Sequence, residues 1–201
     1  MPQPKVLALF DFDGTLTRSD TFLPFLRKVV GISALLRAML LCSPQLLAMA
    51  FNHKKRDRAK IKLLQLTLNK VSRSRLEEIA QSFSGEFSSE KIDDSQLQSL
   101  LAHLNGGDEV VIVSASLRVY VEPIARKIGV TRVIATELEY DKNGICTGKI
   151  KGENCNYLEK KRRIEQEISL NEFGEIYAYG DSRGDLPMLS LATTRCYRGK
   201  T

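Results

Sequence analysis

Apolar residues follow two different periods along this chain. From about Asp20 to Leu104 they recur mostly at intervals of three and four, as in Ile61, Leu64 and Leu68, and this spacing places them on one face of a helix. The region contains no convincing strand pattern. We therefore predict four or five helices within it.

Outside this region, short apolar runs alternate with helical patterns. Five of the six residues at 5–10 are apolar and an Asp-rich turn follows them at once, as expected of a short buried strand. Asp141-Lys142-Asn143-Gly144 predicts a hairpin turn, because Asn-Gly supplies the positive φ angles that tight hairpins need. Further strands are expected at residues 109–113, 131–135 and 175–179, and helices at residues 117–128, 158–168 and 185–192.

This alternation determines the predicted fold class. Strands that alternate with helices favour a parallel sheet covered on both faces. We therefore predict an α/β fold with a doubly wound, Rossmann-like core that is interrupted after its first strand by an all-helical cap. Residues 1–17 and 105–201 are assigned to the core and residues 18–104 to the cap.

The net charge of +6 is concentrated in one segment. Residues 52–75 hold nine Lys or Arg and one Asp, so the rest of the chain is slightly acidic. Such a segment can attract nucleic acid, anionic lipid or a phosphorylated substrate, or it can be a solvated helix face. Because it contains no Phe, Tyr or Trp on which bases could stack, we expect no nucleic-acid partner.

Residues 29–51 form the most apolar stretch of the chain, but Arg37 divides it and Ser43-Pro44-Gln45 breaks its second half. Neither half reaches the ~18 uncharged residues needed to span a bilayer. We expect buried cap helices here, with a face that touches lipid or an apolar substrate as the alternative.

The four cysteines show no zinc-ligand spacing. The N-terminal residues lack the long apolar region of a signal peptide. We therefore expect a reduced cytoplasmic protein. Peripheral contact of the cap with the inner surface of an anionic membrane is left open.

Acidic residues follow two of the predicted strands. Asp11-Phe12-Asp13-Gly14-Thr15 comes directly after the first strand, and Gly180-Asp181-Ser182-Arg183-Gly184-Asp185 follows the last one. The carboxyl ends of parallel strands are where ligands bind, and neighbouring carboxylates repel each other unless a cation or a proton separates them. Mg²⁺ prefers oxygen ligands, so we predict one magnesium site shared by the two acid pairs.

Two further features indicate phosphate. Ser114-Ala115-Ser116 ends a third strand just before a helix, and a small hydroxyl with backbone N–H groups at such a place suits a phosphate oxygen. Lys160 or Lys161, at the start of a later helix, could bring a positive charge to the same phosphate.

The order of these motifs resembles the haloacid dehalogenase (HAD) superfamily of phosphohydrolases. D-x-D-G-T is followed by a strand ending in Ser, then by a lysine, and then by G-D-S-x-x-D. The helical insert is similar to the type 1 cap of subfamily IB, the phosphoserine-phosphatase-like branch. The Gly-Glu-Asn-Cys-Asn run at residues 152–156 is similar to a stretch that precedes the motif lysine there. The resemblance implies a Mg²⁺-dependent phosphatase.

For the chemistry, the resemblance implies that Asp11 is the nucleophile and Asp13 the general acid/base. Mg²⁺ would be bound by the Asp11 carboxylate, the Asp13 backbone carbonyl and Asp181. Lys160 matches the motif lysine better than Lys161 and would contact the phosphate.

The remaining site residues are assigned in the same way. Ser114, with Ala115 beside it, would hold the phosphoryl oxygens, and Asp185 would orient Lys160 or a metal-bound water. Asp20 stands nine residues after the nucleophile, where phosphoserine phosphatases carry a glutamate that meets the substrate amine, although an Asp at this place is also an ordinary helix N-cap.

The substrate is less closely defined than the chemistry. The apolar stretch beside the basic segment favours an anionic, partly apolar substrate such as a lipid phosphate. A phosphoserine-type metabolite phosphatase or a phosphotransferase is the alternative. From another class, a non-enzymatic phospho-receiver or a nucleic-acid-binding module is a distant alternative, since receivers lack a helical insert after their first strand.

Overall fold

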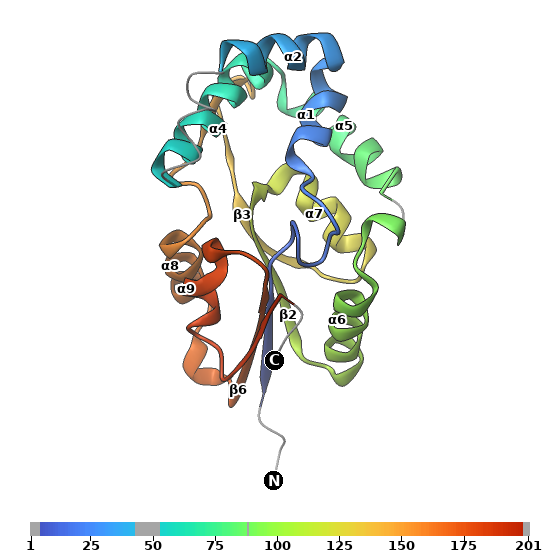
Figure 1. Cartoon of the computed structure of the whole chain (residues 1–201), viewed down its shortest axis with the longest axis vertical. Coiled ribbons are helices and arrows are strands. Elements are labelled where there is room, and N and C mark those ends of the chain that lie inside the picture. The colour runs from blue at the N-terminus through green and yellow to red at the C-terminus, as the bar shows by residue number, and fades with distance from the viewer. Residues whose placement is uncertain (1–4, 43–52, 88, 199–201) are drawn as a thin grey trace.

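The computed structural model describes residues 5–42, 53–87 and 89–198, except for the side chains of residues 53–56 and 89. A five-stranded sheet with flanking helices occupies one half of the molecule, and a group of helices stands over one end of that sheet (Figure 1). The predicted α/β core with a helical insert is confirmed.

The sheet is parallel throughout, with strand order β3-β2-β1-β6-β7. The central strand is β1, and its residues Leu7, Ala8, Leu9 and Phe10 are fully buried, as expected of a strand covered on both faces. Strand β7 was not predicted. The strands are β1 (Val6–Phe10), β2 (Glu109–Leu117), β3 (Arg132–Thr136), β6 (Glu175–Gly180) and β7 (Thr194–Tyr197).

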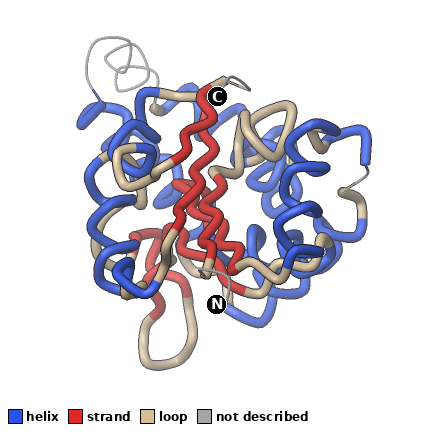
Figure 2. Tube along the Cα trace, turned by 90° about the horizontal axis from the view of Figure 1, so that it is seen from below, coloured by secondary structure: helices blue, strands red, loops and turns tan. Residues whose placement is uncertain are grey.

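Helices cover both faces of the sheet (Figure 2). On one face, Ala8 and Phe10 pack in a cluster with residues of α7 (Arg118–Lys127) and with Leu100 of α6 (Asp94–Gly106). On the other face, Leu7 and Leu9 pack with α8 (Leu158–Glu167) and α9 (Leu186–Leu189). The core is therefore doubly wound.

Two elements differ from their predicted places. Helix α6 lies within the residues assigned to the cap, yet it packs against β1 and β2 of the sheet, and His103 near its end pairs with Tyr179 of β6 (Nε2 to Oη, 2.9 Å). The last helix is shorter than residues 185–192, because Asp185 belongs to a preceding 3₁₀ turn, η4 (Arg183–Asp185), whose capping box it forms with Ser182. The domain boundaries themselves stay predictions.

The cap contains the predicted helices. Leu26, Leu64 and Leu76, from three different cap helices, are fully buried in one shared cluster. The apolar stretch continues beyond Cys42 into residues 43–51, which lie outside the described residues, as does Asn52 of the basic segment. No helix in the described part of the chain is long and apolar enough to cross a membrane. The cap elements are α1 (Phe22–Val30), α2 (Ile32–Leu41), α4 (His53–Leu68), α5 (Arg73–Gly85) and the 3₁₀ turn η2 (Ser89–Lys91).

The predicted hairpin, β4 (Leu138–Tyr140) and β5 (Cys146–Ile150), connects the core to the cap. The segment between α4 and α5 pairs with it along the backbone: Lys70 N donates to Cys146 O (2.9 Å), and Cys146 N donates to Val71 O (2.8 Å). Gly148 of β5 lies directly against α4, since a Cβ built on it would stand 2.7 Å from the Cα of Gln65. The hairpin therefore fixes the position of α4 above the sheet.

We expect Gly148→Ala to destabilise the protein more than Gly144→Ala. Both glycines have positive φ angles, 72° and 74°. Holding an alanine in this left-handed backbone conformation costs about 1–2 kcal/mol at either position. A Cβ on Gly148 would overlap the backbone of α4, whereas nothing lies within 4 Å of a Cβ on Gly144. Gly148→Ala therefore adds an overpacking cost of about 1–3 kcal/mol. Urea unfolding of both variants measures the difference, and equal midpoints would show that this contact does not fix α4.

Candidate active site

A buried lysine joins two carboxylates at the carboxyl end of the sheet. Lys160, in the first turn of α8, is 1% exposed, and its Nζ donates to Asp11 Oδ1 (2.5 Å) and to Asp185 Oδ1 (2.6 Å). Asp11 directly follows β1, and Asp185 follows the neighbouring strand β6. Three distant segments of the chain thus meet at one ammonium group.

Burial and mutual attraction set the charges of these groups. Burial raises the pKa of Asp11 to about 7, although the attraction of Lys160 opposes it. Burial alone would lower the pKa of Lys160, but Asp11 and Asp185 outweigh it and raise that pKa. Burial would raise the pKa of Asp185, but the charge of Lys160 and the hydrogen bonds from Lys160 and Ser182 have the larger effect and lower it. Lys160 is therefore charged at neutral pH.

Asp181 completes a cluster of carboxylates. One oxygen from each of Asp11, Asp181 and Asp185 can be chosen so that all three lie within 4.8 Å of one another. Burial, followed by repulsion from Asp185, raises the pKa of Asp181. Gly14 makes room for it: a Cβ on this residue, whose φ is 81°, would lie 2.6 Å from an Asp181 carboxylate oxygen.

This donor set fits Mg²⁺. All three donors are carboxylate oxygens, which Mg²⁺ prefers, and one ammonium group cannot balance three carboxylates. The carboxylates brought together are those of Asp11, Asp181 and Asp185. The resemblance implied the Asp11 carboxylate, the Asp13 backbone carbonyl and Asp181 as ligands, with Asp185 beside Lys160 or a metal-bound water. The Asp13 carboxylate is turned elsewhere, so only its backbone carbonyl, as predicted, is left to serve as a ligand.

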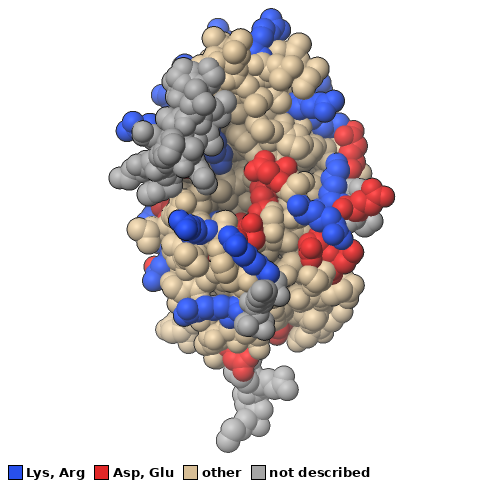
Figure 3. All heavy atoms as spheres, viewed as in Figure 1, with Lys and Arg blue, Asp and Glu red and all other residues tan. Residues whose placement is uncertain are grey.

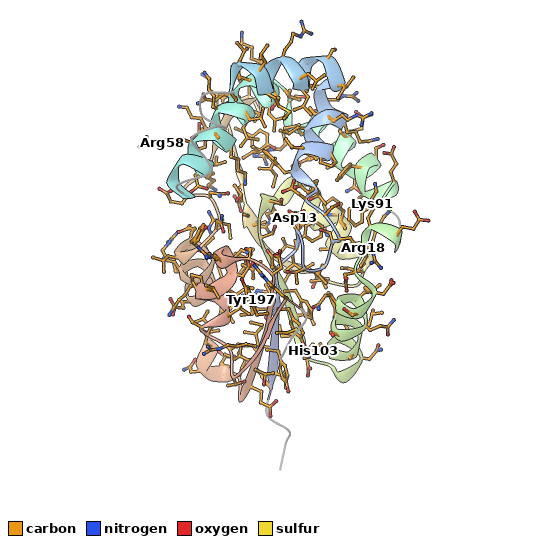
Figure 4. The ribbon with its side chains drawn as sticks, viewed as in Figure 1. Asp13, Arg18, Arg58, Lys91, His103 and Tyr197 are labelled. Carbon is orange, nitrogen blue, oxygen red and sulfur yellow. The ribbon has the colours of Figure 1, made fainter. Side chains whose placement is uncertain are left out.

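The Asp13 carboxylate is held by hydroxyl groups at the junction of core and cap (Figure 4). Its Oδ1 accepts hydrogen bonds from the backbone N and the Oγ1 of Thr21, both at 2.7 Å, and its Oδ2 accepts from Ser116 Oγ. Burial raises the pKa of Asp13, and these hydrogen bonds oppose that rise. Sequence reasoning did not assign Thr21 or Ser116, because no motif links them to Asp13.

The predicted phosphate residues have distinct positions. Ser114 is 1% exposed and lines the same cavity as Asp11, and its Oγ accepts from the backbone N of Ser116 (3.0 Å). This leaves the Ser114 O–H as a donor for a ligand oxygen. Lys161 lies on the surface, where its Nζ is 3.8 Å from Glu165. Of the two lysines, Lys160 alone reaches the carboxylates.

A cavity of about 460 Å³ lies above the carboxylates, between core and cap. Figure 3 shows acidic side chains inside a hollow on this face of the molecule. Asp20 lines the cavity, and its Oδ1 also accepts from the backbone N of Phe22 (2.9 Å) at the start of α1, although the N-cap residue of α1 is Thr21. The apolar wall consists of Phe22, Leu23, Ala59 and Leu63.

Lys60 of α4 brings a cation to this cavity that the sequence did not single out. Its Nζ donates to Ala115 O and to Asn154 Oδ1 (2.7 Å), and Asn154 Nδ2 donates to Asp57 Oδ1 (2.6 Å). Burial lowers the pKa of Lys60 to about 8, although Asp57 and Asp13 attract its charge. Of the nine basic residues at 52–75, the sequence gave no reason to choose this one.

A larger cavity of about 750 Å³ lies between α5, α7 and the hairpin. Its charged side chains pair with one another, as in Arg118 with Glu137 (3.1 Å) and Arg126 with Glu122 (2.6 Å). It contains none of the predicted site residues. We therefore take the cavity above Asp11 as the candidate active site.

Comparison of sequences identifies relatives of this chain. Residues 8–190 match the family model for haloacid dehalogenase-like hydrolases. Protein CicA of Caulobacter vibrioides is 32% identical over 98% of this chain and 88% of its own length. The histidinol-phosphatase of Neisseria meningitidis serogroup C is 29% identical over 63% of this chain and 59% of its own length.

Solved structures show the same fold. A protein of unknown function from Bordetella pertussis Tohama I has a TM-score of 0.82 and 27% identity, covering 96% of this chain and 89% of its own. A substrate-bound phosphoserine phosphatase has a TM-score of 0.67 at 20% identity, covering 97% of this chain and 86% of its own. The second likeness concerns the fold alone.

We expect Asp181→Ala to raise the Mg²⁺ dissociation constant at least about tenfold, equivalent to ~1.4 kcal/mol, because it removes one of three clustered carboxylates. Lys160→Met should leave the affinity unchanged or tighten it, since it removes a positive charge beside the site. Titration calorimetry with Mg²⁺ tests both variants, with the surface substitution Lys161→Met as the control. A similar loss of affinity in Lys160→Met would contradict the separate roles of the two residues.

Proposed function

This chain is a phosphatase that belongs to the haloacid dehalogenase-like hydrolase family, and we propose that it hydrolyses phosphomonoesters with Mg²⁺ through an aspartyl-phosphate on Asp11. The observation that carries the proposal is the Lys160 ammonium shared by Asp11 and Asp185 beside Asp181. This contact supports the proposal because it holds a carboxylate that could act as the nucleophile, a cation, and oxygens that suit a metal ion close together.

The electrostatics of the site favour attack on an anion. A carboxylate and a phosphomonoester repel each other, so both need positive charge nearby before they can react. Asp11, Asp181 and the Asp13 backbone carbonyl would hold Mg²⁺, with Asp185 beside them. When bound, Mg²⁺ neutralises charge on the phosphoryl oxygens and on Asp11. Lys160 supplies the remaining positive charge from the protein itself.

In the first step, a carboxylate oxygen of Asp11 forms a bond to phosphorus while the bond from phosphorus to the leaving alkoxide breaks. Asp13 gives its proton to that alkoxide, and the raised pKa of Asp13 suits a group that must be protonated at this moment. Ser114 O–H and the backbone N–H of Ala115 would hold the phosphoryl oxygens.

In the second step, Asp13 accepts a proton from water, whose oxygen then attacks the phosphorus of the aspartyl-phosphate. The bond between phosphorus and Asp11 breaks, inorganic phosphate leaves, and Asp11 and Asp13 return to their initial states. Two easier steps thus replace one difficult displacement. Thr21 and Ser116 keep the Asp13 carboxylate in one orientation through both steps. A phosphotransferase would use the same first step with another acceptor than water.

We expect Asp11→Asn to reduce hydrolysis of an aryl phosphate to less than about a tenth of the wild-type rate, a loss of more than ~1.4 kcal/mol of transition-state stabilisation, because an amide is a poor nucleophile. Fluoroberyllate, which mimics the aspartyl-phosphate, should bind only the wild type in the presence of Mg²⁺. Asp94→Asn makes the same chemical change on the exposed side of α6 and should keep full activity. Retained activity in Asp11→Asn would rule out the covalent route.

The cavity points to the substrate class. We infer that the substrate carries, besides its phosphate, a partly apolar portion and a second polar group that can accept a hydrogen bond from Lys60. The apolar portion would lie against Leu23 and Leu63, and the second group would face the Lys60 ammonium. A lipid-linked phosphate satisfies both requirements. A small metabolite is the alternative, since relatives are named histidinol-phosphatase and phosphoserine phosphatase, and the carboxylates of Asp20 and Asp57 could meet a substrate amine.

We expect Lys60→Met to raise KM for lysophosphatidate about tenfold or more, because a hydrogen bond to a charged group contributes roughly 1.5–3 kcal/mol. KM for a small aryl phosphate should change little. Lys62→Met, on the exposed side of the same helix, is the matched control. If Lys60→Met raises KM equally for both substrates, Lys60 supports the structure of the site and does not bind the substrate selectively.

The pH dependence provides a second check on Lys60. Its pKa of about 8 means that its charge is present at pH 7 and is lost as the pH rises through 8. KM for lysophosphatidate should therefore rise between pH 7 and pH 9 in the wild type and stay flat in Lys60→Met. A hundredfold preference for phosphoserine over lysophosphatidate would instead favour the metabolite alternative.

A further inference from the structure

Helix α2 exposes a row of large aliphatic side chains. Leu40 is 73% exposed, Leu41 64%, Leu36 57% and Ile32 51%. Ile32, Leu36 and Leu40 are spaced by four residues, so they lie side by side along the helix. Four of the eight large apolar side chains that are exposed in the described residues therefore belong to this one helix.

The exposed row is separate from the part of α2 that holds the cap together. Leu35 and Ala38 are 5% and 4% exposed and pack into the main apolar cluster. The helix forms the end of the molecule opposite the N-terminus (Figure 1). Packing among the described residues of the cap therefore explains the buried face of α2 but not the exposed row.

The charged residues of α1 and α2 are all basic. No Asp or Glu occurs between Asp20 and Asp57, while Arg27, Lys28 and Arg37 do. Arg37 is exposed on α2 itself, and Arg27 is exposed on α1, which packs against α2. Lys28 is neutralised by Glu86 of α5, at 2.5 Å. In Figure 3, basic side chains lie over this end of the molecule.

We propose that α2 is a docking surface for an anionic lipid bilayer, with Ile32, Leu36, Leu40 and Leu41 inserted among the lipids and Arg27 and Arg37 at the headgroups. A helix of 10 residues is too short to span a bilayer but can lie in its interface. Aliphatic side chains gain from leaving water, and the arginines are attracted to anionic headgroups.

A second copy of the chain fits this surface less well than a bilayer does. In a two-fold dimer each copy presents the same patch to the other, so the arginines of both copies would come together without acids to balance them. An anionic bilayer supplies both an apolar interior and negative charge. Docking does not depend on the proposed chemistry, because vesicle binding needs no turnover.

Docking would place the cap next to lipid. A cavity of about 490 Å³ beside α1 and α2 is lined by Leu23, Leu35 and Phe83, and Leu23 also lines the cavity above Asp11. The membrane-facing end of the cap and the active site are thus connected through one apolar side chain.

The test is co-flotation of the purified chain with vesicles of phosphatidylcholine, with and without phosphatidylglycerol. We expect binding only where phosphatidylglycerol is present. The double substitution Leu36→Gln with Leu40→Gln should reduce the partition coefficient at least about tenfold, because it removes two exposed leucines from the inserted row. Leu158→Gln is the matched control, since Leu158 is also 73% exposed but lies on α8. Arg27→Glu with Arg37→Glu should abolish the preference for phosphatidylglycerol.

Hydrolysis of a small aryl phosphate by each variant reports whether the fold is intact. Absence of wild-type binding, or equal binding by the wild type and the double leucine variant, would overturn the proposal. Light scattering adds one more outcome: if the wild type is a dimer that fails to float and the double leucine variant is a monomer, the row joins two copies and the bilayer proposal is wrong.

Discussion

A buried ammonium group shared by two carboxylates is the interaction on which this active site depends. Removing Lys160 from water costs several kcal/mol, and the contacts with Asp11 and Asp185 offset that cost only while both stay in place. These contacts fix β1, the first turn of α8 and the segment after β6 relative to one another. Because Asp181 lies beside them, the cluster keeps an excess of negative charge that favours a divalent cation.

In the proposed function, phosphoryl chemistry and substrate selection depend on different parts of the chain. The carboxylates and Lys160 belong to segments at the end of the sheet, whereas Lys60 and the apolar wall of the cavity belong largely to the cap. The hairpin β4-β5 links the two parts through backbone hydrogen bonds to residues 70–73. Substitutions in the cap can therefore change which ester is accepted while the phosphoryl chemistry is preserved. Helix α2, which carries the exposed row, stands at the end of the cap away from the sheet (Figure 1).

Tertiary contacts also determine which of several similar residues has a role. Lys160 and Lys161 are adjacent, yet one is buried against Asp11 and the other pairs with Glu165 on the surface, because successive residues of a helix point about 100° apart. Asp11 and Asp13 are two residues apart, yet their carboxylates have different partners. Thr21 and Ser116 turn the Asp13 carboxylate away from the cluster, so the two acids can serve as nucleophile and as proton carrier.

The sequence by itself determined the α/β core, the helical insert, the hairpin and the strand ends that carry Asp11, Ser114 and Asp181. These features follow from local periods and turn residues, which need no knowledge of distant contacts. Only the tertiary structure decided that the Asp13 carboxylate turns away from the cluster, that Lys60 reaches the cavity and that α6 packs on the sheet. Each of these depends on partners far away in sequence, such as Asp13 and Ser116, which are 103 residues apart. Local patterns carry no information on such pairs, since folding alone brings them together.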